Sequence, residues 1–161
     1  MTHLIGVSTK FPKRIWLYLC LSALFLVAVG CSGATDETHQ IKLAPKADMP
    51  GYVRDAPKKT QEAYRFAAAN PEILAEIPCY CGCNAMGHHH NLACYVADMN
   101  AEGEVTKFDQ HASYCTICID ITQDVMRLKR AGHSMEDIHD EIVNTYSKYG
   151  PPTLDEAAAT N

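Results

Sequence analysis

The spacing of apolar residues changes along this chain, and each change predicts a different kind of segment. Residues 15–29 form an almost unbroken apolar run, which is shorter than the roughly 20 residues of a membrane-spanning helix. Residues 31–56 show no sustained period and contain prolines and a glycine, so we expect a flexible tether there. From residue 57 onward the apolar residues recur at helical spacing, which predicts one small domain over residues 57–150.

Two short helices are expected at the start of this domain. Pro57 precedes a run of helix-forming residues, and Pro71 follows Asn70, a residue that commonly caps helices. In both segments the apolar side chains fall on one helical face. A cysteine-rich loop follows the second helix directly.

Two further helices are predicted in the second half of the domain. Apolar residues share one face over residues 109–131, and a last helix begins after Ser134 and stops before a glycine and two prolines at residues 150–152. Between the helix pairs, Leu92, Cys94 and Val96 alternate as in a short strand, and residues 100–103 resemble the turn of a β-hairpin. We therefore predict a mainly α fold of about four helices with a cysteine-rich loop and a small hairpin, followed by a loose tail over residues 151–161.

The N-terminus has the three parts of an export signal, and residues 28–31 resemble the cleavage site of bacterial lipoproteins. Basic residues precede the apolar run, and small residues lead to Cys31. We expect residues 1–30 to be removed and Cys31 to carry lipid; an ordinary signal peptide cut nearby is the alternative. The lipid-anchored protein would lie outside the cytoplasm, on the outer face of the cell membrane or the periplasmic membrane face.

The charge balance argues against nucleic acid as a partner. The chain has 14 basic and 19 acidic side chains, and three of the basic ones, Lys10, Lys13 and Arg14, lie in the predicted signal peptide. Nucleic-acid binding depends on Lys and Arg that neutralise phosphates. The acidic mature chain suits a domain held near a membrane.

The main candidate chemistry is a concentration of cysteine and histidine over residues 79–118. Thiolate and neutral imidazole are ligands of soft and borderline metals. The candidate metal ligands are Cys79, Cys81, Cys83, His88, Cys94, His111, Cys115 and Cys118.

The spacing of these residues indicates two ligand faces. In an extended segment, Cys79, Cys81 and Cys83 would point to one side. If a helix begins near residue 109, then His111, Cys115 and Cys118 lie on one helical face. We expect the two faces to meet in one site, closed by Cys94 and by a histidine of the run at residues 88–90.

Disulfide use is the main alternative to metal binding. Six cysteines in a small exported domain commonly pair, and a reactive pair would make a thiol–disulfide redox module. Disulfides have no use for imidazole, however, which favours metal. The candidate assignments are zinc in a structural domain that mediates protein interaction, Cu(I) in a sulfur-rich cluster, and an iron–sulfur cluster. No motif indicates catalysis apart from this thiol chemistry.

The sequence PCYCGC at residues 78–83 resembles the name-giving motif of the bacterial PCYCGC-motif lipoproteins. The likeness extends to Gly87-His88 and Cys94, to residues 108–112 leading into Cys115 and Cys118, and to residues 138–146. This resemblance implies an exported lipoprotein with these residues in its site, and it leaves the chemistry open. We expect Cu(I) binding for metal storage, delivery or homeostasis, with a metal donor or acceptor protein as partner.

Overall fold

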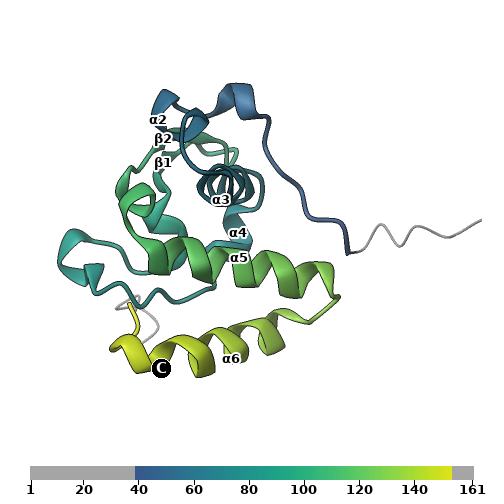
Figure 1. The fold of residues 1–161 in the computed structure, drawn as a ribbon. Helices are drawn as coiled ribbons and strands as arrows, with labels where there is room; N and C mark the ends of the chain where they lie inside the picture. Colours follow the sequence, from purple (N-terminus) through teal and green to yellow (C-terminus); the bar gives the residue numbers. More distant parts are fainter. Residues whose placement is uncertain (1–38, 154–161) are drawn as a thin grey trace, which may run out of the picture. The chain divides into compact units, whose positions relative to one another are not determined.

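The computed structural model describes residues 39–153 (Figure 1). This part of the chain contains five α-helices and one antiparallel hairpin, so the predicted mainly helical fold is confirmed. The predicted signal peptide, the lipidation site Cys31 and residues 154–161 of the tail lie outside the described residues. Within residues 39–153, no helix is long and apolar enough to cross a membrane.

The core is built where α5 packs between α3 and α6 (Figure 1). The three helices span Lys58–Ala69, Thr116–Arg130 and Met135–Tyr146, and the first and the last lie close to the limits that the apolar stripes predicted. Each buries one face, as amphipathic helices do. The largest buried core side chains include Tyr64, Phe66, Tyr95, Ile121, Met126, Ile138 and Ile142.

The predicted hairpin is present, although its first strand begins later than the alternation suggested. Strands β1 (Val96–Met99) and β2 (Val105–Phe108) pair antiparallel, and Gly103 turns the chain at a positive φ of 81°. Leu92 and Cys94, expected in the strand, instead lie in the short 3-10 helix η4 (Asn91–Cys94). Their alternation therefore reflects burial in a helical turn.

Part of the segment predicted as a tether is folded onto the domain. It contains η2 (Lys46–Asp48) and α2 (Gly51–Arg54), and its residues Met49 and Val53 are buried in the core. The Arg65 side chain and backbone also exchange hydrogen bonds with the Ala44 backbone. The tether prediction was wrong for this stretch. Its buried apolar residues are isolated in the sequence, so they give no periodic hydrophobic pattern that would indicate a folded segment.

The beginning of the predicted loose tail is also fixed. Thr153 is buried, its backbone N–H donates to the Cys79 carbonyl at 2.7 Å, and its hydroxyl accepts from the Cys79 N–H at 2.9 Å. These two bonds tie residue 153 to the cysteine-rich loop. The tail prediction was therefore wrong at Thr153, since a single anchored residue leaves no periodic signal.

The third predicted helix begins later than expected. Helix α5 starts at Thr116 and is preceded by the 3-10 helix η5 (His111–Tyr114). The Asp109 carboxylate accepts a hydrogen bond from the His111 N–H at 2.7 Å. Such local side-chain bonds offer the backbone an alternative to the α-helix, so the expected continuous face from His111 to Cys118 was wrong.

We expect Gly132→Ala to destabilise the protein. Gly132 follows α5 at φ 83°, and a Cβ there would collide with the His39 ring. The left-handed backbone alone costs a non-glycine residue about 1–2 kcal/mol. Urea unfolding of the variant should give a free energy of unfolding lower by at least about that amount. Gly87→Ala is the control, because a Cβ at Gly87 would meet no atom within 4 Å and the variant therefore shows the backbone cost without the collision.

Candidate metal centre

The cysteine-rich loop follows α4 (Pro71–Ala75) and is bent at Gly82. Gly82 has a φ of 75°, a left-handed conformation that favours glycine. The bend ends the extended segment and starts the 3-10 helix η3 (Cys83–Met86). As a consequence, Cys83 leaves the direction that Cys79 and Cys81 share.

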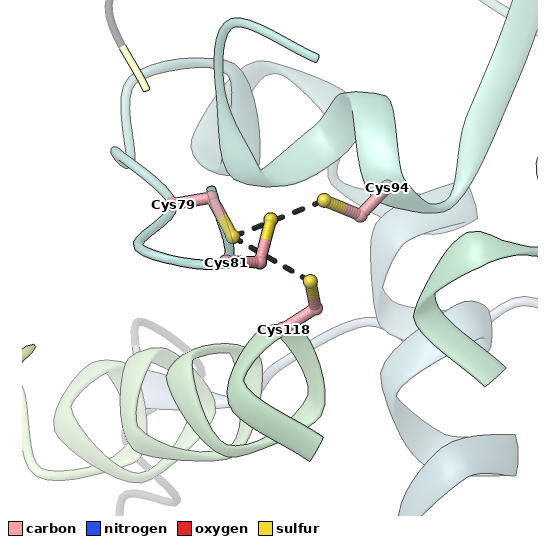
Figure 2. Close-up of side chains that lie close together, drawn as sticks. All are labelled: Cys79, Cys81, Cys94 and Cys118. Carbon is pink, nitrogen blue, oxygen red and sulfur yellow. Dashed lines mark hydrogen bonds between the residues drawn. The ribbon is translucent and has the colours of Figure 1, made fainter. Parts of the chain in front are cut away.

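A first group of ligands consists of four sulfurs from three elements. The side chains of Cys79, Cys81, Cys94 and Cys118 point toward one another from the loop, η4 and α5 (Figure 2), and their sulfurs all lie within 4.8 Å of one another. The Cys79 Sγ is 3.5 Å from the Cys118 Sγ and 3.9 Å from the Cys94 Sγ. Four sulfurs at this separation could hold one tetrahedral metal ion.

A second group shares two of these sulfurs. Cys81 and Cys118 also lie within 4.8 Å of His111 and Cys115. Cys115 is the residue immediately before α5, and Cys118 belongs to its first turn. Two four-ligand groups therefore meet along a common edge formed by Cys81 and Cys118.

A third group contains Cys83, His88 and His111. The Cys83 Sγ lies 2.9 Å from the His111 Nε2, close enough to share a hydrogen. The rings of His88 and His111 meet edge to face, with their centroids 5.0 Å apart. His111 is common to the second and third groups, so all three groups are linked.

The eight predicted ligands are thus brought together, but in three linked groups instead of one site. Cys83 was expected beside Cys79 in a single centre; the bend at Gly82 places it with His88 and His111. The structure selects His88 from the histidine run, since His89 and His90 belong to none of the groups. That these residues bind metal stays a prediction.

Contacts among the thiols alter their acidity. Hydrogen bonds, first from Cys118 and then from Cys81, hold the pKa of Cys79 far below its ordinary value. Hydrogen bonds from Cys115 and then Cys118 lower the pKa of Cys81 to about 2, whereas burial raises the pKa of Cys83 to about 12. The centre therefore combines thiolates with neutral thiols, and a metal would displace the remaining S–H protons.

None of the six cysteines in the described residues forms a disulfide. The 3.5 Å between the Cys79 and Cys118 sulfurs is well beyond the roughly 2.05 Å of a sulfur–sulfur bond. The six cysteines of residues 39–153 are thus in the reduced state, in which their sulfurs can bind a metal ion.

A buried polar network positions the first turn of α5, and the sequence did not reveal it. The Tyr95 hydroxyl donates to the Cys118 carbonyl at 2.7 Å, and the Asn91 side chain donates to the same carbonyl at 3.4 Å. The Thr122 hydroxyl donates to the Asn91 side-chain oxygen at 2.7 Å. Most buried polar groups in proteins are hydrogen-bonded. Thr122 supplies the hydrogen bond that the buried Asn91 side-chain oxygen needs.

We expect Thr122→Val to lower the free energy of unfolding by about 1–3 kcal/mol, because the buried Asn91 oxygen loses its donor. Denaturant unfolding of the metal-free protein measures this effect. Thr145→Val is the matched control, since Thr145 bonds an exposed glutamate at the surface of α6. Equal stability of the two variants would contradict the structural role of the network.

The fold and the centre define a small helical protein whose cysteine and histidine clusters could hold a metal ion. A family model described as a protein of unknown function with PCYCGC motif matches residues 21–157. The chain therefore belongs to the PCYCGC-motif family, as the motif predicted. No curated protein and no solved structure matches it significantly.

Proposed function

We propose that this protein is an exported, lipid-anchored protein that binds Cu(I) in a thiolate-bridged cluster, for copper storage, delivery or homeostasis. The metal would come from, or pass to, a partner protein outside the cytoplasm. The membrane anchor rests on the sequence around Cys31 and not on the described residues. The copper assignment rests on the arrangement of the sulfurs.

The observation that carries the proposal is the sharing of Cys81 and Cys118 between the first two groups. A thiolate sulfur can bind two Cu(I) ions at once, so two adjacent ions can be held with fewer ligands than two separate sites need. Soft thiolate ligands select Cu(I) over harder ions. Five sulfurs and one imidazole in these two groups match that preference.

Zinc is the second candidate, and the geometry of the single groups favours it. Each of the first two groups offers four ligands, which is the number that structural zinc requires. A zinc site would stabilise the domain and leave it a role in protein interaction. The two metals differ in stoichiometry and in their response to air, which makes them separable by experiment.

Anaerobic titration of the reduced protein with Cu(I), and separately with Zn²⁺, tests the proposal. We expect more than one Cu(I) to remain bound against a competing Cu(I) chelator, with emission typical of copper–thiolate clusters that exclude water. Retention of zinc but not of copper would favour the structural zinc alternative. Retention of neither, with thiols that oxidise to disulfides in air, would favour a redox module.

The anchor is tested by replacing Cys31. We expect the native protein to sediment with membranes and to enter the detergent phase, and Cys31→Ala to lose lipid attachment while Cys20→Ala keeps it. A Cys31→Ala protein that remains lipid-modified would overturn the proposed anchor without affecting the metal site.

A further inference from the structure

An open cavity of about 570 Å³ borders the third ligand group. His88 lines this cavity together with Met86, Met99, Asp98 and Asp109. Cys83 and His88 belong to the third group alone. Of the eight ligands, His88 is the one that lines this cavity, so the third group reaches it through His88. Cys115 of the second group lines a smaller opening of about 280 Å³.

The His88 side chain is arranged as a metal ligand is. His88 is only 6% exposed, and its Nδ1 is buried without a hydrogen-bond partner among the described residues. Such an atom is costly to leave unpaired in a folded protein. Its other ring nitrogen, Nε2, lies 3.7 Å from the Asp109 carboxylate. Metal-binding histidines commonly have a carboxylate behind the second nitrogen, which orients the ring.

Two exposed methionines stand at the same cavity. Met86 is 61% exposed and Met99 is 39% exposed, which makes them two of the few large apolar side chains left in solvent within residues 39–153. Thioethers are soft ligands for Cu(I), and methionine adapts readily to different partners. Their position at the mouth beside His88 suits a transient contact with an incoming or departing ion.

We propose that Cys83, His88 and His111 form a separate, exchangeable copper site through which Cu(I) enters and leaves the sulfur-rich centre. This inference rests on the proposed copper function. The three residues leave one coordination position for a ligand from a donor or from Met86. His111 also belongs to the second group, so an ion in the exchange site already touches a ligand of the neighbouring group.

The exchange step requires no change of oxidation state. Cu(I) replaces the hydrogen shared by the Cys83 Sγ and the His111 Nε2, one copper–sulfur and one copper–nitrogen bond form, and a proton passes to solvent. The donor's ligand leaves as His88 Nδ1 binds. Transfer to the second group then breaks the copper bonds to Cys83 and His88 and forms bonds to Cys81 and Cys115, and a proton that an incoming thiol loses passes to the released Cys83 sulfur.

The inference is tested by mixing the fully loaded protein with a Cu(I) chelator and monitoring the transfer of copper by stopped-flow absorbance. For the native protein we expect a fast phase of one equivalent, followed by slower release. His88→Ala and Cys83→Ser should bind one Cu(I) fewer and lose the fast phase, with release slowed by at least about tenfold. His89→Ala, at the neighbouring histidine, is the control and should behave as the native protein does. Met86→Leu should slow the fast phase and leave the stoichiometry unchanged.

The outcomes separate this inference from the proposed function. Native stoichiometry and a retained fast phase in both His88→Ala and Cys83→Ser would overturn the exchange site and leave the copper cluster standing. Loss of all copper in either folded variant would show that the site is not separate. If the native protein binds no Cu(I), the proposed function fails and the exchange site falls with it. Cys83→Ser provides the test should His88→Ala not fold.

Discussion

Cys81→Ser is expected to weaken metal binding at both four-ligand groups at once. Cys81 belongs to the first and the second group, so its loss leaves three ligands in each. Removal of a residue that merely orients a ligand costs about 10–100-fold in metal affinity, and a shared ligand should cost at least the upper figure. We expect a decrease of about 100-fold or more in Cu(I) affinity, measured by chelator competition.

Cys115→Ser is the matched control for this experiment. Cys115 is half-buried as Cys81 is, but it belongs to the second group only. The Cys115→Ser variant should keep the four sulfurs of the first group able to hold an ion, so that one tightly bound copper remains. Equal losses in Cys81→Ser and Cys115→Ser would contradict the sharing of Cys81 between two metal positions.

Metal loading is expected to stabilise the domain strongly. The centre joins the loop at residues 79–83, η4 and the start of α5, and these elements separate on unfolding. A ligand that binds only the folded state adds about 4 kcal/mol when its free concentration is 1,000 times the dissociation constant. Anaerobic denaturant unfolding with buffered Cu(I) should therefore show a higher midpoint than the metal-free protein.

Two controls belong to that measurement. Mg²⁺ prefers oxygen ligands and should not change the midpoint, and Cys81→Ser should lose most of the gain. An unchanged midpoint for the native protein at saturating Cu(I) would mean that the metal binds the unfolded chain equally well, which would contradict a preformed centre.

The long elements of the fold could be predicted, and the short ones that position the ligands could not. Helices α3, α5 and α6 each bury one face, and this leaves a period in the sequence. The 3-10 helices η4 and η5 are too short to show a period. They depend on local hydrogen bonds. The His111 N–H donates to the Asp109 carboxylate, and the Ala93 N–H donates to the His90 Nδ1.

The composition of the site could be predicted, whereas its division into groups could not. Thiolate and imidazole chemistry identifies the ligands from residue type alone. Their grouping depends on the positive φ of Gly82, which separates Cys83 from Cys79, and on distant partners such as Thr153, which is 74 positions beyond Cys79 and holds its backbone. A single sequence gives no sign of such long-range contacts.

The stoichiometry of Cu(I) in the reduced native protein tests the central claim most directly. Elemental analysis after anaerobic loading and removal of weakly bound metal by a competing chelator should give at least two copper ions per chain, with thiols that react only after the metal is removed. A protein that retains no copper under these conditions, with all six domain thiols free to react, would contradict the metal centre.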